Sequence, residues 1–396
     1  MSTVPRNPIE AVTHPDPYTY YARLVERTPI YRDEAAGYWV VSSAAAVTDV
    51  LDSALCRVRP AREQVPTALL GSAAGEIFRH LVRMNDGQEH DALKQAVISA
   101  LHTLDLAQTA QLSRTWASLL LEKLKPERQT GRLSDFAFSL PVYTIASLLG
   151  VPGEHLEQTA RWMSDFVRCL APSSTPEQLE SGKAAANHLR ELLRACLASQ
   201  EATGTQSLLS HLARAVRSAG YADMDTAIDN GVGLISQSYE ATAGLIGNTL
   251  LTLARRPNIR ALARAEPVLL PALVQEVLRY DPPVHNTRRF LSSDGRVAGR
   301  EMQAGEVILV LLAAANRDAA ANPDPRQFKL VRPERRVFTF GTASHACPGD
   351  MLASLIAQGG IAQILASDFN TQQLPRTVPY RASANTRVPL FEGEQL

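Results

Sequence analysis

Apolar residues recur at spacings of three and four along most of the chain, which is the period of an α-helix with one buried face. The stretches 18–27, 44–51, 106–124 and 185–197 follow this pattern. Residues 135–149 are more uniformly apolar, as expected of a buried helix, and the Gly-Val-Pro sequence that follows ends them. The pattern therefore predicts a mainly helical protein.

The longest mainly apolar segment covers residues 225–255, and Pro257 ends it. Apolar side chains fall on most faces of the helix that it predicts, which indicates a helix through the core. Glu240 lies near its middle, within the sequence Gln-Ser-Tyr-Glu-Ala-Thr. A carboxylate is costly to bury unless it is paired or solvated. Glu240 is therefore either a functional group or a residue on an exposed turn of the helix.

Short β-rich runs interrupt the helices. Residues 39–41 and 307–312 predict strands, and residues 367–396 predict a small sheet with a tail. The fold class is mainly α with small β-sheets (α+β). The sequence has no internal repeat and no low-complexity tract, and a chain of 396 residues can bury a large core. We expect a single domain over residues 1–396, with residues 1–14 as a flexible tail.

The chain carries 40 basic and 40 acidic residues. This balance argues neither for nor against a nucleic-acid surface, and no nucleic-acid partner is predicted. The N-terminus lacks the basic and apolar regions of a signal peptide, and the longest purely apolar run, residues 307–315, is too short to span a bilayer. Four widely spaced cysteines show no zinc or disulfide spacing, which favours a reducing compartment. We expect a soluble, cytoplasmic protein with no membrane association.

The stretch 338–349 places Cys347 in a bend of glycine, proline and small residues, with aromatic residues before it and an apolar, helix-like run after it. Backbone N–H groups in such a bend can point at the sulfur, which stabilises a thiolate and tunes a metal bound to it. A buried free cysteine in a turn is equally compatible with these residues. The loop alone leaves both interpretations open.

The order Phe340-x-x-x-x-His345-x-Cys347-x-Gly349 resembles the haem-binding loop of cytochromes P450. The resemblance extends over residues 15–389, with the family's motifs in order, and it is closest to the soluble bacterial type. It implies a cytochrome P450 fold, with haem b held between the long core helix and the helix after the cysteine loop. Cys347 would be the axial thiolate ligand of the iron. Ala343 departs from the family, which usually has glycine there.

The resemblance also assigns residues to the haem propionates. These are His345, Arg289, His90 and Lys94, of which Lys94 stands where the family usually has arginine and so lacks the bidentate fork. Without the resemblance, His90 and Lys94 would be neighbours on a solvated helix face.

Glu276 and Arg279 are spaced for a salt bridge on one helix face, a weak signal by itself. The family resemblance implies that they form a buried charge network with Arg332. A further departure from the family is the pair Gly359-Gly360 inside the helix after the cysteine. Each glycine should lower the stability of the helix by about 1 kcal/mol relative to alanine. The pair indicates either a bend or close packing.

The core helix resembles the oxygen-activating helix of the family. Glu240 keeps the usual acid, Ala241 replaces the usual threonine, and Ser238 replaces the usual glycine. Because Ala241 has no hydroxyl, another group must deliver protons to oxygen. The candidates are Glu240, Ser238, Thr242, and a hydroxyl or carboxylate of the substrate. On a helix, Ser238 and Thr242 should face other directions than Ala241.

The function implied is a haem-thiolate monooxygenase that inserts oxygen from O2 into a C–H bond of a small organic substrate, as a monomer that receives electrons from a ferredoxin-type donor and its reductase. The resemblance places Gln237, Val284, His285 and Asn286 beside the substrate. Gln237, His285 and Asn286, together with Ser238, would add polar groups to an apolar pocket, which favours a substrate with a carboxylate, hydroxyl or amide. Secondary-metabolite biosynthesis, on a terpenoid, polyketide or peptide-derived scaffold, is the commonest use of such proteins. The alternatives are a peroxide-driven or oxidative-coupling P450, or a catalytically silent haem-binding protein.

Overall fold

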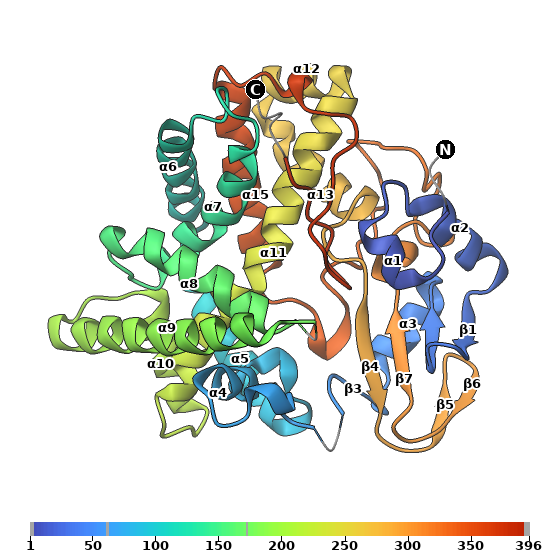
Figure 1. Ribbon diagram of the computed structural model, residues 1–396, viewed down its shortest axis with the longest axis horizontal. Coiled ribbons are helices and arrows are strands. Elements are labelled where there is room, and N and C mark those ends of the chain that lie inside the picture. Colours follow the sequence, from blue (N-terminus) through green and yellow to red (C-terminus); the bar gives the residue numbers. More distant parts are fainter. Residues whose placement is uncertain (1–3, 61–62, 172, 392–396) are drawn as a thin grey trace.

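Helices form most of the molecule (Figure 1), as the spacing of apolar residues predicted. The computed structural model describes residues 4–60, 63–171 and 173–391. The α-helices in this part of the chain are α1 (Pro8–Thr13), α2 (Tyr18–Arg27), α3 (Ala44–Asp52), α4 (Ala73–His80), α5 (Gly87–Leu101), α6 (Leu106–Leu124), α7 (Arg132–Leu148), α8 (Leu156–Cys169), α9 (Pro176–Thr203), α10 (Leu208–Ser218), α11 (Asp225–Arg255), α12 (Pro257–Ala265), α13 (Leu270–Tyr280), α14 (Leu312–Ala315) and α15 (Asp350–Ala366).

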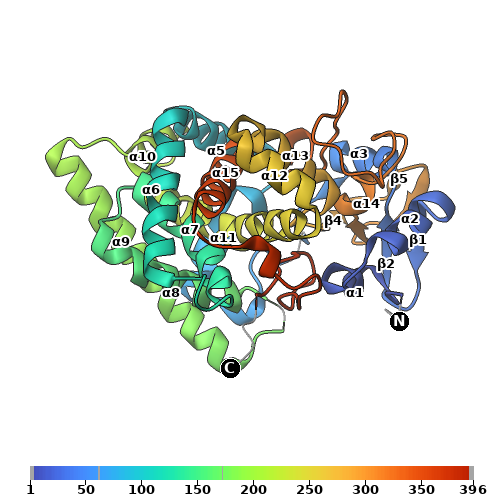
Figure 2. The same ribbon diagram turned by 90° about the horizontal axis from the view of Figure 1, so that it is seen from above.

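Helix α11 runs through the middle of the molecule, and its bounds are those that the sequence predicted. It lies between α7 and α15 on one side and strand β4 (Thr287–Leu291) on the other (Figures 1 and 2). Most of its residues are buried, because apolar side chains occupy nearly all of its faces. In the described ranges, neither α11 nor any other helix combines the length and apolar character that crossing a bilayer needs.

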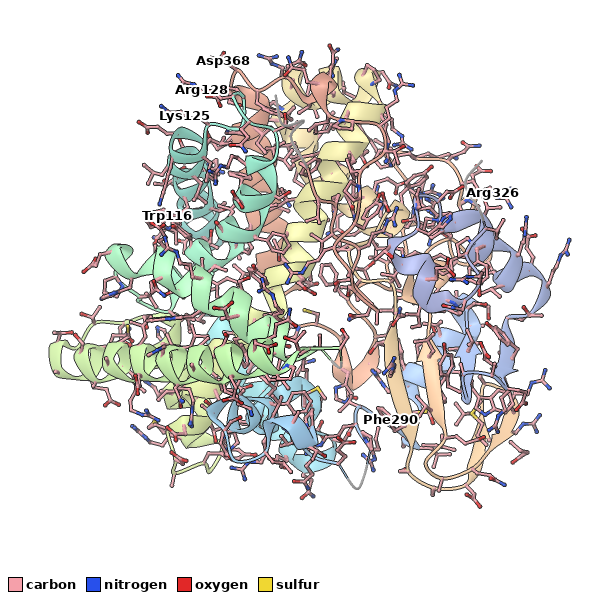
Figure 3. The ribbon with its side chains drawn as sticks, in the orientation of Figure 1. Trp116, Lys125, Arg128, Phe290, Arg326 and Asp368 are labelled. Carbon is pink, nitrogen blue, oxygen red and sulfur yellow. The ribbon has the colours of Figure 1, made fainter. Side chains whose placement is uncertain are left out.

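One mixed sheet lies beside the helices. Its order is β1 (Ile30–Asp33), β2 (Tyr38–Val41), β7 (Val307–Val310), β4 and β3 (Cys56–Arg57), and only the β2–β7 pair is parallel. Strands β5 (Gly295–Val297) and β6 (Arg300–Met302) form a separate hairpin. In Figure 3, Phe290 of β4 marks the part of the molecule that holds the sheet, and Trp116 of α6 marks the helical part on the opposite side.

The small sheet expected after residue 367 is not present in residues 367–391. This segment makes only two isolated bridges, Val284–Thr386 and Tyr380–Pro389. Prolines at 375, 379 and 389 remove backbone donors, which shortens any ladder that the segment could form. The remaining residues of the prediction, 392–396, lie outside the described ranges.

The N-terminal segment differs from the flexible tail expected over residues 1–14. Residues 8–13 form α1, with Ala11 and Val12 fully buried, and residues 1–3 lie outside the described ranges. Arg387, itself 1% exposed, donates hydrogen bonds to the carbonyl oxygens of Val12 (2.9 Å) and His14 (2.7 Å) and pairs with Asp281 (3.1 Å). A guanidinium far along the sequence therefore holds this segment, which local composition could not reveal.

The glycine pair in α15 reflects close packing. The helix continues without interruption through Gly359 and Gly360. A Cβ on Gly359 would lie 2.5 Å from the hydroxyl oxygen and 3.0 Å from the Cβ of Ser113 on α6, and a Cβ on Gly360 would lie 2.7 Å from a methyl group of Leu140 on α7. The two glycines thus allow α6 and α7 to approach the helix that follows the cysteine loop.

The carboxylate of Glu276 on α13 is fully buried and receives several donors. Arg279 donates at 2.7 and 3.1 Å, Arg335 at 3.0 Å, the backbone N–H of Lys329 at 2.9 Å, and Arg332 approaches at 3.5 Å. Burial alone would raise the pKa of Glu276, but the hydrogen bond from Arg279 and the nearby positive charges hold it below its ordinary value. Arg335 is a member of this network that the sequence analysis missed.

Replacing Glu276 with glutamine should lower the free energy of unfolding by about 3–5 kcal/mol, because three arginines would lose their buried counter-charge. Urea unfolding of the holoprotein measures this loss. Glu157→Gln, which breaks the exposed Lys123–Glu157 pair, is the matched control and should have a much smaller effect. Equal effects of the two substitutions would contradict a special role for the buried network.

Gly359→Ala should destabilise the protein by about 1–3 kcal/mol despite the better helix propensity of alanine, because the added methyl group meets the Cβ and backbone of residues on α6. Gly360→Ala should cost less, since the side chain of Leu140 can move. Thermal unfolding of the two single variants and of Gly359→Ala with Ser113→Ala tests this, and the double variant should recover part of the loss. Stabilisation by Gly359→Ala would contradict close packing.

Candidate active site

A cavity of about 280 Å³ lies between α11, α5 and the cysteine loop. It gathers residues that are up to 271 positions apart in sequence, from Val82 to Ala353: the loop supplies its floor and α11 one of its walls. The predicted site residues that line it are His90, Lys94, Gln237, Ser238, Ala241, Thr242, Val284, Phe340, His345, Cys347 and Gly349. The remaining walls are mainly apolar, with Val97, Leu234 and Leu245 among them.

The loop before α15 presents the Cys347 sulfur to this cavity. The Cys347 N–H donates to the Phe340 carbonyl oxygen at 2.8 Å, and this bond closes the loop. Gly341 and Ala343 have φ values of +70° and +56°, so Ala343 keeps the left-handed conformation for which glycine is better suited. Burial raises the pKa of the Cys347 thiol, whereas the Gly349 N–H and the charge of Lys94 lower it.

Basic side chains gather beside this loop. The rings of His90 and His345 lie 4.0 Å apart between centroids, and Lys94 Nζ donates to the carbonyl oxygens of Ser344 (3.0 Å) and Ala346. Burial and the neighbouring His345 lower the pKa of His90. His345 also contacts Asp86 at 3.2 Å, a partner that the sequence analysis missed.

These features fit a haem. A thiol that faces an apolar cavity suits a soft thiolate ligand for iron, and the cationic group at the rim suits two propionates. Cys347 would hold the iron, while His90, Lys94 and His345 would hold the carboxylates. Phe340 and Gly349 line the space next to the sulfur.

Arg289 is not among the residues that line this cavity, although the resemblance placed it at a propionate. It is 6% exposed and donates to the Arg288 carbonyl oxygen (2.9 Å), and Cys56 and Asp86 act on it electrostatically. Strand alternation puts Arg289 on the buried face of β4, where its partner Asp86 is also the residue that contacts His345. Burial lowers the pKa of its guanidinium.

Four neighbouring side chains of α11, those of Gln237, Ser238, Ala241 and Thr242, line one part of the cavity. Ser238 and Thr242 share a hydrogen bond of 2.8 Å between their hydroxyl groups, and Ala241 lies beside them. The expectation that the two hydroxyls face away from Ala241 is therefore wrong, because positions three and four apart share a helix face. Gln237 donates its amide to the Gly233 carbonyl oxygen at 2.9 Å.

Glu240 points away from this cavity. Its carboxylate pairs with Arg381 at 3.0 Å and accepts a hydrogen bond from the Thr386 hydroxyl at 2.9 Å. Thr386 bridges to Val284, which does line the cavity. The acid is thus paired, as the cost of burying it requires, and it fixes a turn behind the cavity wall.

His285 and Asn286 also lie outside the cavity, although they were expected to contact substrate. His285 is fully buried and shares a hydrogen bond of 2.9 Å with the Tyr21 hydroxyl, and Asn286 donates to the Ala384 carbonyl oxygen at 2.8 Å. Burial and the charges of Arg387 and Arg317 hold the pKa of His285 well below its ordinary value. Both side chains fix backbone and packing next to Val284.

Arg83, Asn230 and Leu234 line the cavity without having been singled out from the sequence. The available signal was an arginine between apolar residues (Leu81, Val82 and Met84), in a stretch without helical period. Such a signal does not distinguish a surface arginine from one that points inward.

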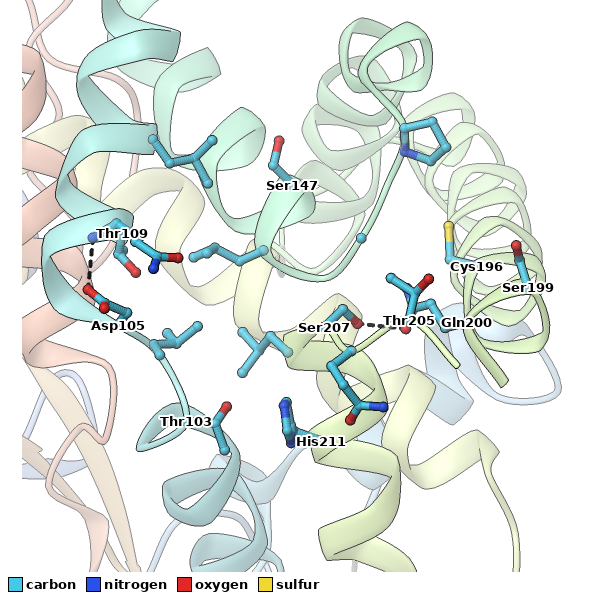
Figure 4. Close-up of a pocket in the computed structure, with 18 of the residues that line it drawn as sticks. Thr103, Asp105, Thr109, Ser147, Cys196, Ser199, Gln200, Thr205, Ser207 and His211 are labelled. Atoms are coloured by element: carbon cyan, nitrogen blue, oxygen red, sulfur yellow. Dashed lines mark hydrogen bonds between the residues drawn. The ribbon is translucent and has the colours of Figure 1, made fainter. Parts of the chain in front are cut away.

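A larger pocket of about 1030 Å³ opens between α6, α9 and α10 (Figure 4). Polar groups such as Asp105, Gln200 and Ser207 line it, and Ser207 donates to Gln200 at 2.6 Å. It contains none of the residues predicted for the site, so its size does not make it the centre of the chemistry.

Comparisons with known proteins agree with this geometry. The sequence model of the family described as "Cytochrome P450" matches residues 151–382. The chain is 26% identical to the "Biotin biosynthesis cytochrome P450" of Bacillus subtilis (strain 168), over 88% of each chain. It is 27% identical to the "20-oxo-5-O-mycaminosyltylactone 23-monooxygenase" of Streptomyces fradiae, over 94% of this chain and 86% of that protein.

Solved structures show the same fold. The crystal structure of P450BioI in complex with an acyl carrier protein ligated to hexadec-9-enoic acid superposes with a TM-score of 0.81 at 24% identity, covering 94% of this chain and 96% of that one. Matching family, relatives and fold lead to one conclusion: the chain belongs to the cytochrome P450 family, whose members bind haem.

Proposed function

We propose that this cytochrome P450 monooxygenase uses haem b to insert one oxygen atom of O2 into a C–H bond of a small organic substrate that bears a polar group. The observation that carries the proposal is the single cavity that joins Cys347 to Ser238, Ala241 and Thr242 of α11. Among the relatives, one is named a 20-oxo-5-O-mycaminosyltylactone 23-monooxygenase and one a biotin biosynthesis cytochrome P450, which supports a biosynthetic role, and we propose a step in the biosynthesis of a secondary metabolite.

The residues divide the work as follows. Cys347 binds the cofactor, and the haem-thiolate supplies the activation of O2 when bound. His90, Lys94 and His345 hold the propionates, and the apolar wall around Leu234 and Leu245 excludes water from the substrate. We further propose a ferredoxin-type electron donor with its reductase, a monomeric protein and a cytoplasmic location.

Proton delivery is the unusual part of the proposal. Ala241 presents a methyl group where the family usually has a threonine hydroxyl. Ser238 and Thr242 hold two hydroxyl hydrogens on the same face, and one of them remains available after the bond between the two side chains. We propose that the Ser238 hydroxyl orients a hydroxyl group of the substrate, and that this hydroxyl donates the proton that the chemistry consumes.

The haem assignment predicts that the reduced protein with carbon monoxide shows the spectrum of a thiolate-ligated haem, and that Cys347→Ser loses it, because serine gives no thiolate. A panel of acids, alcohols and amides is first tested for the haem spin-state shift, and the compound with the largest shift is chosen. Product formation from this compound is then measured in two separate assays, one with surrogate ferredoxin and reductase and one with hydrogen peroxide. We expect product with electrons and O2. Product with peroxide alone would favour a peroxide-driven enzyme, and no product under either condition would favour a silent haem-binding protein.

Ala241→Thr should change the fraction of electrons that end in product by less than about twofold, because the proton already has a route. Ser238→Ala should lower that fraction by about tenfold, less than the roughly 10²–10⁴-fold effect of a group that transfers the proton itself, because Ser238 only orients the donating group. Both follow from product formed per electron consumed, with the same compound and the surrogate partners. A large increase in Ala241→Thr would mean that the natural relay is poor and would contradict substrate assistance.

A further inference from the structure

Arg83 places a positive charge in the cavity without a counter-charge. Its side chain lines the same space as Cys347 and Ala241, and it makes no hydrogen bond or ion pair within residues 4–60, 63–171 and 173–391. The residue keeps a large accessible surface, and the protein atoms around its side chain nevertheless lower the pKa of its guanidinium by burial. A guanidinium stays charged in proteins, and an unpaired charge in an apolar site is costly. An anion that enters this cavity would remove that cost.

The backbone on both sides of Arg83 is fixed. Asn230 of α11 accepts a hydrogen bond from Val82 N–H (3.0 Å) and donates to the His80 carbonyl oxygen (2.8 Å). Asn85, which is 1% exposed, donates to the carbonyl oxygens of Arg79 (3.0 Å) and Leu81 (2.9 Å). Two buried amides thus hold the segment against the helix that forms the cavity wall. An arginine on such a segment is positioned before any ligand arrives, which reduces the entropy lost on binding.

The other basic side chains of the cavity already have partners near the cysteine loop. Lys94 donates to loop carbonyl oxygens, His345 contacts Asp86, and His90 lies against His345 and Asp91. Arg83 belongs instead to the segment that Asn230 fixes to α11. Lys94, His345 and His90, which suit the cofactor propionates, are therefore held by other elements than Arg83.

We infer that Arg83 binds a carboxylate of the substrate, so that the substrate is a free acid with an apolar body rather than an acyl group esterified to a carrier. One fixed guanidinium matches one carboxylate in charge and in its bidentate geometry. A phosphate dianion would call for further unpaired cations, and the residues that line the cavity supply none. The apolar wall of Val97, Ile145 and Leu245 suits the remainder of the molecule. This inference rests on the proposed function, since it names the substrate class of the same site.

Binding to the holoprotein tests the inference. The probes are matched pairs of decanoate with decanamide and 4-phenylbutyrate with 4-phenylbutyramide, measured by equilibrium dialysis and by the haem spin-state shift. The wild-type protein should bind at least one carboxylate at least about tenfold more tightly than its amide, as hydrogen bonds to charged groups do. Arg83→Gln should remove this preference, and Arg83→Lys should keep part of it.

Arg79→Gln is the matched control, because Arg79 lies four positions earlier and forms an exposed pair with Glu76. It should leave the preference unchanged. The rate of haem transfer to apomyoglobin should be the same in Arg83→Gln as in the wild type. Faster haem loss with an unchanged carboxylate preference would assign Arg83 to a propionate and overturn the inference. The absence of a carboxylate preference in the wild type across both pairs would overturn it as well.

These outcomes are separate from those of the proposed function. Dialysis needs neither electrons nor O2, so a carboxylate preference without turnover would refute the monooxygenase proposal alone. Turnover of neutral compounds, together with equal binding of acid and amide, would refute the assignment of Arg83 alone.

Discussion

The buried carboxylate of Glu276 is the interaction on which the haem side of the molecule depends. It joins α13 to the segment 329–335, which leads directly into the cysteine loop. Arg279 extends this link to the carbonyl oxygens of Pro325 and Gln327. The position of the Cys347 sulfur therefore depends on a charge network that lies outside the cavity. Packing completes the arrangement, because the glycines of α15 let α6 and α7 support the helix that begins just after the cysteine.

The cavity is lined by two separate sets of polar side chains. The groups beside the loop have local partners and suit a cofactor, whereas the α11 side offers hydroxyls and an unpaired guanidinium. Glu240, the one acid in the middle of α11, belongs to neither set, because Arg381 and Thr386 hold it behind the wall. Its contacts give it a structural role in this chain.

The sequence predicted features that depend on local pattern. The bounds of α11 follow from a continuous apolar run, and Cys347 follows from an ordered set of motifs. The directions of single side chains depended on tertiary contacts that the sequence did not contain. Arg289 and His285 are examples, since neither lines the cavity: Arg289 lies on the buried face of β4, and His285 has a buried contact with the Tyr21 hydroxyl. The sequence analysis missed Arg83 as a cavity residue because a tertiary contact with Asn230, about 150 positions later, decides where its segment lies. Ala343 shows that a departure from a motif can leave the backbone conformation unchanged.

Arg387 joins parts of the chain that are distant in sequence. Its guanidinium binds the backbone of residues 12–15 and the side chain of Asp281, while its own backbone N–H donates to the Pro283 carbonyl oxygen. Val284 and Thr386, which are paired next to it, border the cavity wall. A local opening that breaks the contacts of Arg387 with residues 12–15 would therefore also loosen the wall beside the substrate.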